Sequence, residues 1–370
     1  MISNYILTIV IPAYNVESTI WDTVSSIFDS RLHSCCEILI VNDGSTDSTP
    51  EILQRLKQEY SNVKVVNKAN GGHGSVINTA ISLAQGKYFR ILDGDDWIES
   101  SAFDSYIECL LQTDADLIIS NYVLVNEKTG KIVDSVIFNA VPDRTTVSFE
   151  EYVDKGGSFI GLHAFTIKTL ILRDNSISVD ERVFYEDTQY VLYPIVFVNT
   201  ILISGDIVYR YRVASDTQSI NPQNVLKNRG HRITVIKGLL TYYSKHMNST
   251  SAQKKNYYLQ RTLEAVLGQY RLLAELKQRN VLDSSEIDEI DDLISQNTLI
   301  TEAVNKTFSY RITHPNPWFS KLMSTVKSSF SNQRFGRLMS RIENRFANRY
   351  LERRVKRAQS HGNSDEDSIN

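Results

Sequence analysis

Up to Leu92 the sequence alternates between short apolar runs and segments whose apolar residues recur at helical spacing. This βαβ rhythm constrains the fold, because neighbouring parallel strands need a helical crossover. It predicts an α/β protein with a doubly wound, mostly parallel sheet. The expected strands are Ile6–Ile11, Glu37–Val41, Val63–Val66 and Lys87–Leu92, and the expected helices are Ser18–Phe28, Thr49–Tyr60 and Val76–Ala84.

Polar and Gly-rich segments follow the ends of these expected strands. They are Asp43, the turn Gly71–Ser75 and the cluster Asp93–Asp96. Ligands of doubly wound sheets bind beyond the carboxyl ends of the strands. The sequence therefore predicts a ligand site at this edge of the sheet.

The fourth run ends in three carboxylates within four positions, Asp93, Asp95 and Asp96. Carboxylates crowded at the end of a buried strand repel one another, so they imply a bound cation. With no Cys or His close by, a hard ion such as Mg²⁺ or Mn²⁺ is favoured, and it would be well placed to bridge a diphosphate. A solvated turn is the alternative, with Asp96 as a helix cap.

Three further features have both a functional and a structural interpretation. The Gly-rich turn Asn70–Ser75 favours close approach of an anion to backbone, although a plain turn fits as well. In Pro12–Asn15, Tyr14 would stack on a base while Asp43 accepts from a ring N–H; a turn proline with a capping aspartate is the alternative. The pair Glu186–Asp187 either caps a helix or takes a proton from an attacking hydroxyl.

The rhythm changes beyond residue 115. Asp116–Val125 and Lys131–Phe138 predict antiparallel additions, and Ile201–Val213 predicts one long strand or a strand pair. After about residue 222 the pattern is almost wholly helical. The expected organisation is an α/β domain at 1–220, a helical C-terminal region at 221–358 and a disordered polar tail at 359–370.

Cysteine content and the lengths of the apolar runs indicate the cellular compartment. The 370 residues are 42% hydrophobic and 22% charged, as in an ordinary globular protein. Three cysteines make no disulfide framework and fit a reducing cytoplasm. Neither a secretory signal nor a run long enough to span a membrane is visible. We therefore expect a cytoplasmic protein.

Together these segments resemble the inverting glycosyltransferases of family 2, of the bacterial surface-polysaccharide type, which have the Rossmann-like GT-A fold. The motifs stand in family order over roughly residues 5–220. They are Leu7–Asn15, Ile40–Asp47, Asn70–Ser75, Leu92–Asp96, Tyr185–Asp187 and Val208–Arg212.

The resemblance implies metal-dependent transfer of a sugar from a UDP-sugar donor. Asp187 would be the general base, and Glu186 would position a sugar. Asp95 would bind Mn²⁺ or Mg²⁺ directly, and Asp93 would contact ribose or the metal. The donor nucleotide would meet Pro12, Tyr14, Asn15, Asp43, Asn67, Gly71, Gly72, Asn78, Asp93 and Gly94.

The chain departs from the commonest family pattern where loops would cover the cleft and carry specificity. His73 stands where Gly, Gln or Val is frequent, and Gly161–Ala164 replaces a frequent Trp-x-Lys stretch. We expect the acceptor to meet His163, Thr166, Lys168 and Trp97, and the diphosphate to meet Arg210 and Arg212. A structural role is the alternative for His163.

The segment Arg311–Arg357 carries twelve basic side chains against two acidic ones. Its apolar residues recur near helical spacing, which predicts a basic amphipathic helix on an anionic membrane surface. A helix packed on its own domain or on another subunit is the alternative. Nucleic acid is not expected, because the rest of the chain is acidic and carries no recognisable binding module. The oligomeric state stays open.

The expected activity is transfer of a hexose or N-acetylhexosamine to a hydroxyl of a lipid-linked oligosaccharide. It would serve surface polysaccharide or capsule biosynthesis at the inner face of the cell membrane. The alternatives are the same chemistry on a protein O-glycan and a catalytically inactive partner subunit. A sugar-nucleotide-forming nucleotidyltransferase fits less well, because Pro12–Val16 lacks the Gly-rich basic loop that class needs after its first strand.

Overall fold

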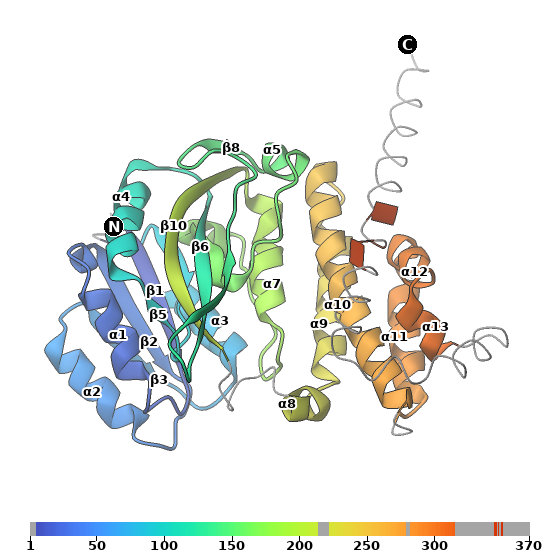
Figure 1. The fold of residues 1–370 in the computed structure, drawn as a ribbon, viewed down its shortest axis with the longest axis horizontal. Helices are drawn as coiled ribbons and strands as arrows, with labels where there is room; N and C mark the ends of the chain where they lie inside the picture. The colour runs from blue at the N-terminus through green and yellow to red at the C-terminus, as the bar shows by residue number, and fades with distance from the viewer. Residues whose placement is uncertain are drawn as a thin grey trace, which may run out of the picture. The chain divides into compact units, whose positions relative to one another are not determined.

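The computed structural model describes residues 5–213, 222–278 and 282–314, together with 344, 345, 347, 349 and 350 (Figure 1). The chain forms two compact units, of which the first ends at His231 and the second begins at Arg232. The predicted tail at 359–370 and most of the basic segment Arg311–Arg357 lie outside the described residues.

Over the described part of the chain, ten strands form one sheet in the first unit. Its main path is β3-β2-β1-β4-β9-β6-β10-β5, while β7 pairs with β6 and β8 pairs with β10. The strands are β1 (Leu7–Ala13), β2 (Cys36–Asn42), β3 (Val63–Asn67), β4 (Tyr88–Ile91), β5 (Trp97–Ile98), β6 (Leu117–Asn126), β7 (Ile132–Val136), β8 (Thr146–Ser148), β9 (Phe165–Lys168) and β10 (Thr200–Val213).

The predicted doubly wound half of the sheet is confirmed. Strands β1 to β4 are parallel to one another. The helices α1 (Ile20–Phe28), α2 (Thr49–Glu59) and α3 (His73–Leu83) connect them. Helix α3 begins at His73, earlier than the predicted Val76, because Gly72 adopts a φ of 82° and turns the chain directly into the helix.

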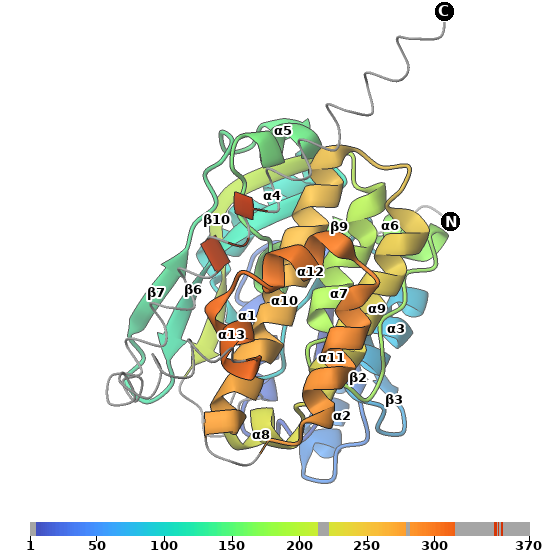
Figure 2. The ribbon, with the colours of Figure 1, turned by 90° about the vertical axis from the view of Figure 1, so that its right-hand side faces the viewer.

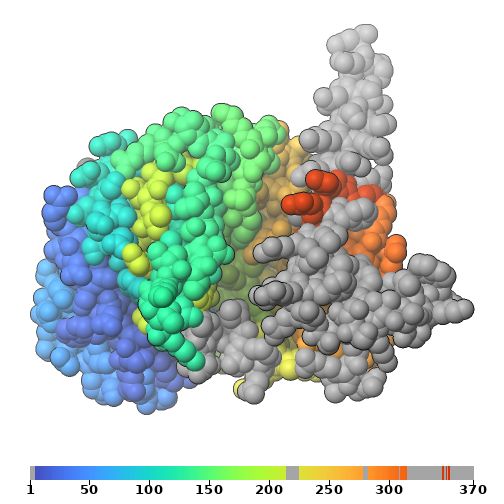
Figure 3. Space-filling view, in the orientation of Figure 1, coloured from blue at the N-terminus to red at the C-terminus, as the bar shows by residue number. Residues whose placement is uncertain are grey.

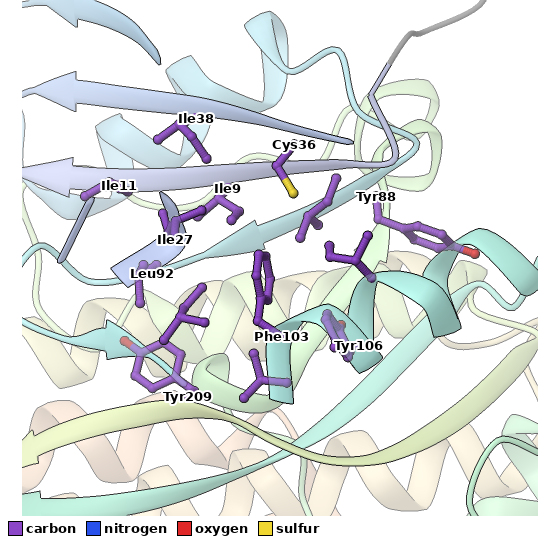
Figure 4. Packing of buried hydrophobic residues seen from close by; sticks show 14 of the residues in the cluster. Ile9, Ile11, Ile27, Cys36, Ile38, Tyr88, Leu92, Phe103, Tyr106 and Tyr209 are labelled. Carbon is purple, nitrogen blue, oxygen red and sulfur yellow. The ribbon is translucent and has the colours of Figure 1, made fainter. Parts of the chain in front are cut away.

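Helices cover both faces of this half. Ile9 and Ile11 of β1 lie in a buried cluster with Ile27 of α1 and Phe103 of α4 (Ser100–Gln112) (Figure 4). Helix α3 contacts β1 and β2 but contributes nothing to that cluster, so it covers the opposite face. The strands are therefore buried on both sides, as parallel sheets require.

The predicted antiparallel additions are also present. Strand β9 runs antiparallel between β4 and β6, and β6 and β7 form the expected hairpin. Strand β10 is one long strand, parallel to β6, with register shifts around Ile207. Gly205 lies within the first of these shifts, between Ile203 and Ile207, with a φ of 80°. The hairpin lies on the surface of the first unit (Figure 3), where Ile132 and Val133 are each 55% exposed.

The helix predicted to run to Val198 is shorter than expected. Helix α7 (Asp187–Leu192) ends before the 3₁₀ turn η3 (Tyr193–Phe197). Pro194 lies in that turn, and its missing N–H prevents continuation of the α-helix. The other short elements of the first unit are η1 (His33–Cys35), α5 (Phe149–Asp154), η2 (Leu162–Ala164), α6 (Thr169–Asp174) and α8 (Pro222–Lys227).

The second unit is helical in its described part (Figure 2). Its core contains Leu263, Leu267 and Ile290, all fully buried. Among the described residues, none of the helices combines the length and apolar character that crossing a membrane requires. The helices are α9 (His231–His246), α10 (Ala252–Gln278), α11 (Ser285–Ser295), α12 (Thr298–Val304) and α13 (Phe308–Thr313).

The approach of β4 to β1 leaves no room for a side chain at Gly86. A Cβ atom there would lie 2.3 Å from the Thr8 amide nitrogen. We expect Gly86→Ala to lower the free energy of unfolding by about 1–3 kcal/mol, measured by urea denaturation with tryptophan fluorescence. The matched control is Gly161→Ala, where no described atom lies within 4 Å. Equal stability of the two variants would contradict this packing.

Candidate active site

A cleft of about 760 Å³ lies in the first unit beyond the carboxyl ends of the central strands. Its walls come from the ends of β1, β2 and β4, the start of α3, the turn η2 and the segment before α7. This is the edge at which doubly wound sheets bind their ligands.

Most of the predicted functional side chains meet in this cleft. Tyr14 is 50% exposed there, so its ring is accessible to a planar ligand. Asp187 is also exposed, at the start of α7. The predicted residues that line the cleft are Pro12, Tyr14, Asp43, Gly72, Asp93, Gly94, Asp95, His163, Glu186 and Asp187.

Four predicted donor-binding residues lie beside the cleft and support its loops instead of lining it. The side-chain oxygen of Asn15 accepts from the Thr46 amide at 2.8 Å, and that of Asn67 accepts from Asn42 at 2.9 Å. The other two are Gly71, whose carbonyl accepts from the Arg182 amide, and Asn78, whose amide group bonds both backbone groups of Val179.

Three predicted acceptor residues are engaged away from the cleft. Thr166 is fully buried and accepts from Arg90 at 3.1 Å. Lys168 lies within 3.0 Å of Asp116, and Trp97 does not line the cleft. The arrangement does not favour the predicted contacts of Thr166, Lys168 and Trp97 with an acceptor.

The two predicted diphosphate ligands do not line the cleft, and both side chains are bonded to protein groups. The Nε atom of Arg210 donates to Glu99 at 2.6 Å, and that of Arg212 donates to the Asp95 carbonyl at 2.6 Å. Tyr211, between them, lines the cleft. Alternating residues of a strand point to opposite faces, so the arginines and Tyr211 leave β10 in different directions. The geometry does not favour Arg210 or Arg212 as diphosphate ligands.

Asp43 organises the Gly-rich turn. One carboxylate oxygen accepts from the Gly71 amide at 2.9 Å and from Lys68 Nζ at 2.7 Å, and the other accepts from the Gly72 amide at 2.8 Å. Among the described contacts, this second oxygen has one donor and two lone pairs. Asp43 can therefore hold the turn and still accept a hydrogen bond from a ligand.

The aspartate cluster divides into an anchor and two residues that line the cleft. Asp96 is 1% exposed, and its oxygens accept from the Tyr209 hydroxyl at 2.6 Å and the Arg212 amide at 2.7 Å. It is thus a buried tie to β10 and not a helix cap. Asp93 and Asp95 line the cleft instead.

The charges in this cluster fit a divalent cation. Burial and the neighbouring Asp93 charge raise the pKa of Asp95 to about 6. Burial, Asp93 and Asp95 raise the pKa of Asp96 well above its usual range. Burial is the larger cause of both shifts and the neighbouring carboxylates add to it, and a bound cation would favour the charged form of each group. Asp93, Asp96 and His163 can bring ligand atoms within 4.8 Å of one another, but Asp96 is already bonded, so Asp93 and Asp95 are the better candidate ligands.

His163 reaches this cluster because β9 runs antiparallel to β4. Arg90 pairs with Thr166 in that register, so the residues before β9 lie opposite those after β4. His163 Nε2 lies 3.8 Å from Asp93 Oδ2, and its ring stacks on Tyr211 with centroids 4.3 Å apart. Burial lowers the pKa of His163, which favours the neutral imidazole.

Glu186 and Asp93 face His73 from two sides. His73 Nδ1 lies 2.6 Å from Glu186 Oε1, and Nε2 lies 3.6 Å from Asp93 Oδ1. Burial opposes a charge on His73, but the attraction of the Asp93 and Glu186 carboxylates outweighs it and raises the pKa of His73 well above its usual value. Glu186, 4% exposed, is thus bound to the protein while Asp187 faces the cleft.

The sequence profile described as Glycosyl transferase family 2 matches residues 8–167. The putative glycosyltransferase EpsH of Bacillus subtilis is 35% identical over 141 residues, which are 37% of this chain and 40% of that protein. The first unit belongs to glycosyltransferase family 2. The poly(ribitol-phosphate) beta-glucosyltransferase of Bacillus spizizenii is 28% identical over 220 residues, 58% of this chain. The matches cover less than two thirds of either relative, 40% and 33% of their lengths.

Solved structures confirm the fold expected of this family. The structure of S. aureus TarS residues 1–349 with UDP-GlcNAc has a TM-score of 0.62 and 18% identity, covering 83% of this chain and 87% of that one. The mannosyltransferase PcManGT of Pyrobaculum calidifontis, with GDP-Man and Mn²⁺, has a TM-score of 0.52 and 11% identity, covering 95% and 86%. The family 2 unit therefore has a GT-A-like architecture, followed by a helical region.

The family 2 cleft also contains residues that the sequence did not single out. Among them are Arg182, Phe184, Tyr185 and Tyr211, of which Tyr185 and Tyr211 belong to quoted motifs but were given no role of their own. The alternation of Tyr and Arg at 208–212 was the available signal for Tyr211, because period two in a strand separates the residues into two faces. The other three follow no periodic pattern and are brought to the cleft by an irregular segment.

That irregular segment is strained. Arg182 and Tyr185 have φ values of 59° and 74°, which side chains other than Gly rarely adopt. A bulky residue in this conformation costs on the order of 1–3 kcal/mol and persists only where its surroundings enforce it. Tyr185 immediately precedes Glu186 and Asp187, so the strain is located where the acidic pair enters the cleft.

The strain at Tyr185 can be measured with two variants that remove the same ring. We expect Tyr185→Gly to be more stable than Tyr185→Ala by about 1 kcal/mol, because only Gly tolerates positive φ without a steric penalty. At an ordinary helical or extended position the order would be reversed. Urea denaturation of the two variants measures the difference, and a more stable Tyr185→Ala would exclude the strained conformation in solution.

Proposed function

We propose that this protein is an inverting, metal-dependent glycosyltransferase that moves a hexose or N-acetylhexosamine from a UDP-sugar to an oligosaccharide hydroxyl. The observation that carries the proposal is the meeting of Asp93, Asp95 and Asp187 in one cleft of a family 2 unit. A cation-binding pair and a separate carboxylate at one site match the two tasks of this reaction. One task is neutralising a departing diphosphate, and the other is activating a hydroxyl.

The donor nucleotide would lie along the ends of β1 and β2. Tyr14 offers an exposed ring for the base, and Asp43 retains capacity to accept a hydrogen bond from a ring N–H. The start of α3 brings a helix N-terminus to the same wall, next to Gly72, whose amide is bonded to Asp43. The TarS neighbour was solved with UDP-GlcNAc, which supports a nucleotide-sugar donor of this class.

Asp93 and Asp95 would hold Mn²⁺ or Mg²⁺. The ion would neutralise the charge that develops on the diphosphate as the sugar departs. The hard oxygen ligands and the crowded negative charge of the cluster support this choice. Asp96 would keep the cluster in place through its bonds to β10.

Asp187 would remove the proton from the attacking acceptor hydroxyl. Its position at the first residue of α7, on the wall of the cleft, supports this role. The C–O bond to the diphosphate breaks as the bond to the acceptor oxygen forms on the opposite face of the sugar. One such displacement inverts the anomeric centre, so an α-linked donor would give a β-glycoside.

The acceptor is proposed to be a lipid-linked oligosaccharide in surface polysaccharide synthesis, with the enzyme peripheral at the inner face of the membrane. The relative named poly(ribitol-phosphate) beta-glucosyltransferase supports a polymer acceptor. Cosedimentation of the full chain with anionic vesicles measures the proposed membrane association. A protein O-glycan remains the alternative acceptor, while the intact Asp93, Asp95 and Asp187 disfavour an inactive partner subunit.

Removal of the proposed base should abolish transfer without abolishing donor binding. We expect Asp187→Asn to lower the rate of UDP release from the bound UDP-sugar by about 10²–10⁴-fold, the usual contribution of a general base. Titration calorimetry should give a UDP affinity close to that of the wild type. The control is Asp134→Asn, on the exposed strand β7. Unchanged turnover in Asp187→Asn would refute the assignment.

Removal of the proposed metal ligand should abolish metal-dependent binding. We expect UDP to bind the wild type more tightly with Mn²⁺ than with EDTA, and Asp95→Asn to lose that difference because one oxygen ligand is neutralised. Calorimetric titration with UDP, then with UDP-glucose, UDP-galactose and their N-acetyl forms, measures both the metal effect and the donor. Equal wild-type affinities with Mn²⁺ and EDTA would exclude a metal-bridged diphosphate.

A further inference from the structure

His73 lies between the two acidic elements of the cleft. Its Nδ1 atom is 2.6 Å from Glu186 Oε1, in the segment that leads into α7. Its Nε2 atom is 3.6 Å from Asp93 Oδ1, at the end of β4. One imidazole ring therefore contacts both the proposed metal-binding cluster and the residue next to the proposed base Asp187.

The start of α3, which carries His73, packs closely against the segment before α7. A Cβ atom at Gly74 would lie 2.1 Å from the Asp180 carbonyl oxygen, so α3 and this segment are in direct backbone contact. The Arg182 amide donates to the Gly71 carbonyl at 2.9 Å, and Asn78 bonds both backbone groups of Val179. The position of the ring thus follows from a closely packed interface.

The His73 ring separates two carboxylates that would otherwise face each other. Asp93 and Glu186 carry like charges, and without an intervening donor they would repel each other across the cleft. Glu186 is 4% exposed, so its loss of a partner would leave a buried acceptor unsatisfied. Either effect would displace the start of α7, and a shift of about 1 Å can slow a positioned reaction by about 10²-fold.

We propose that His73 is a positioning residue, which fixes Glu186, and through it Asp187, at a set distance from the donor-side Asp93. This inference rests on the proposed function. His73 also lines the cleft, but its two ring nitrogens face the carboxylates of Glu186 and Asp93, so the proposed role is exerted through these two residues. The distance between the proposed cation site and the proposed base would then depend on this one side chain at the start of α3.

The two ring nitrogens can be tested separately. In His73→Asn the amide nitrogen replaces Nδ1, so the hydrogen bond to Glu186 is retained and the contact with Asp93 is lost. In His73→Gln the amide nitrogen replaces Nε2, so the contact with Asp93 is retained instead. We expect His73→Gln to lower kcat for UDP release by about tenfold or more, with KM changed less than about threefold. His73→Asn should retain most of kcat, because it keeps the 2.6 Å hydrogen bond to Glu186 and loses only the 3.6 Å contact with Asp93, which is longer than a hydrogen bond.

A double-mutant cycle tests whether His73 acts through Glu186. The variants are His73→Gln, Glu186→Gln and the double variant, with rates normalised to the fraction of protein that binds UDP. Residues that act as a unit give a double variant no slower than the slower single variant. The control is His246→Gln in the second unit, an exposed residue stacked on Tyr242, which should leave kcat unchanged.

Three results would overturn the inference. The first is equal loss in His73→Asn and His73→Gln, as a packing role of the ring would give. The second is a double variant whose loss in kcat equals the product of the two single losses. The third is a change in KM with kcat unchanged. Asp187→Asn separates these from failure of the proposed function, because full turnover in that variant refutes the function itself. If the wild type turns over none of the four UDP-sugars, function and inference are both refuted for this donor class.

Discussion

The hydrogen bonds of one buried carboxylate join the two halves of the sheet. Asp96 follows β4 in the parallel half, and its partners Tyr209 and Arg212 belong to β10 in the later half. Asp96 thereby ties the loop between β4 and β5 to strand β10. Because Asp93 and Asp95 lie in this loop, the geometry of the proposed cation site depends on a contact between residues 113 positions apart.

Both acidic motifs of the cleft pair a buried, hydrogen-bonded carboxylate with an accessible one. In the pair Asp95 and Asp96, the second residue is buried and bonded while the first lines the cleft. In the pair Glu186 and Asp187, the first is buried against His73 while the second is exposed. An anchored carboxylate next to an accessible one gives a precise position to a charged group that must also meet a substrate.

The sequence was sufficient for the parallel half of the fold and for the edge where the site lies. Periodicity identified β1 to β4 and their helices, and the ends of those strands led to Asp43 and the aspartate cluster. Periodicity also predicted the β6–β7 hairpin. These features are local in sequence, so local patterns carry them.

The rest of the site depends on contacts that local patterns do not contain. The acidic motifs did not reveal which neighbour would be buried, since that depends on Tyr209 and His73 from distant elements. The positive φ at Tyr185 contradicts the ordinary preference of an aromatic residue, so propensity could not predict it. The arginines beside Tyr211 had plausible charge for a diphosphate, but they leave β10 on the other face from Tyr211 and do not line the cleft.

The insertion of β9 between β4 and β6 has a consequence for the order of folding. Strands β1, β2 and β3 find partners close in the chain, whereas β4 and β6 meet their shared neighbour only after Phe165–Lys168 has been made. Pairings over such distances form late, because loop closure precedes any reward from contact. The turn η2, with His163, arrives with β9. We therefore expect the wall of the cleft that contains His163 to form later in folding than the parallel half of the sheet.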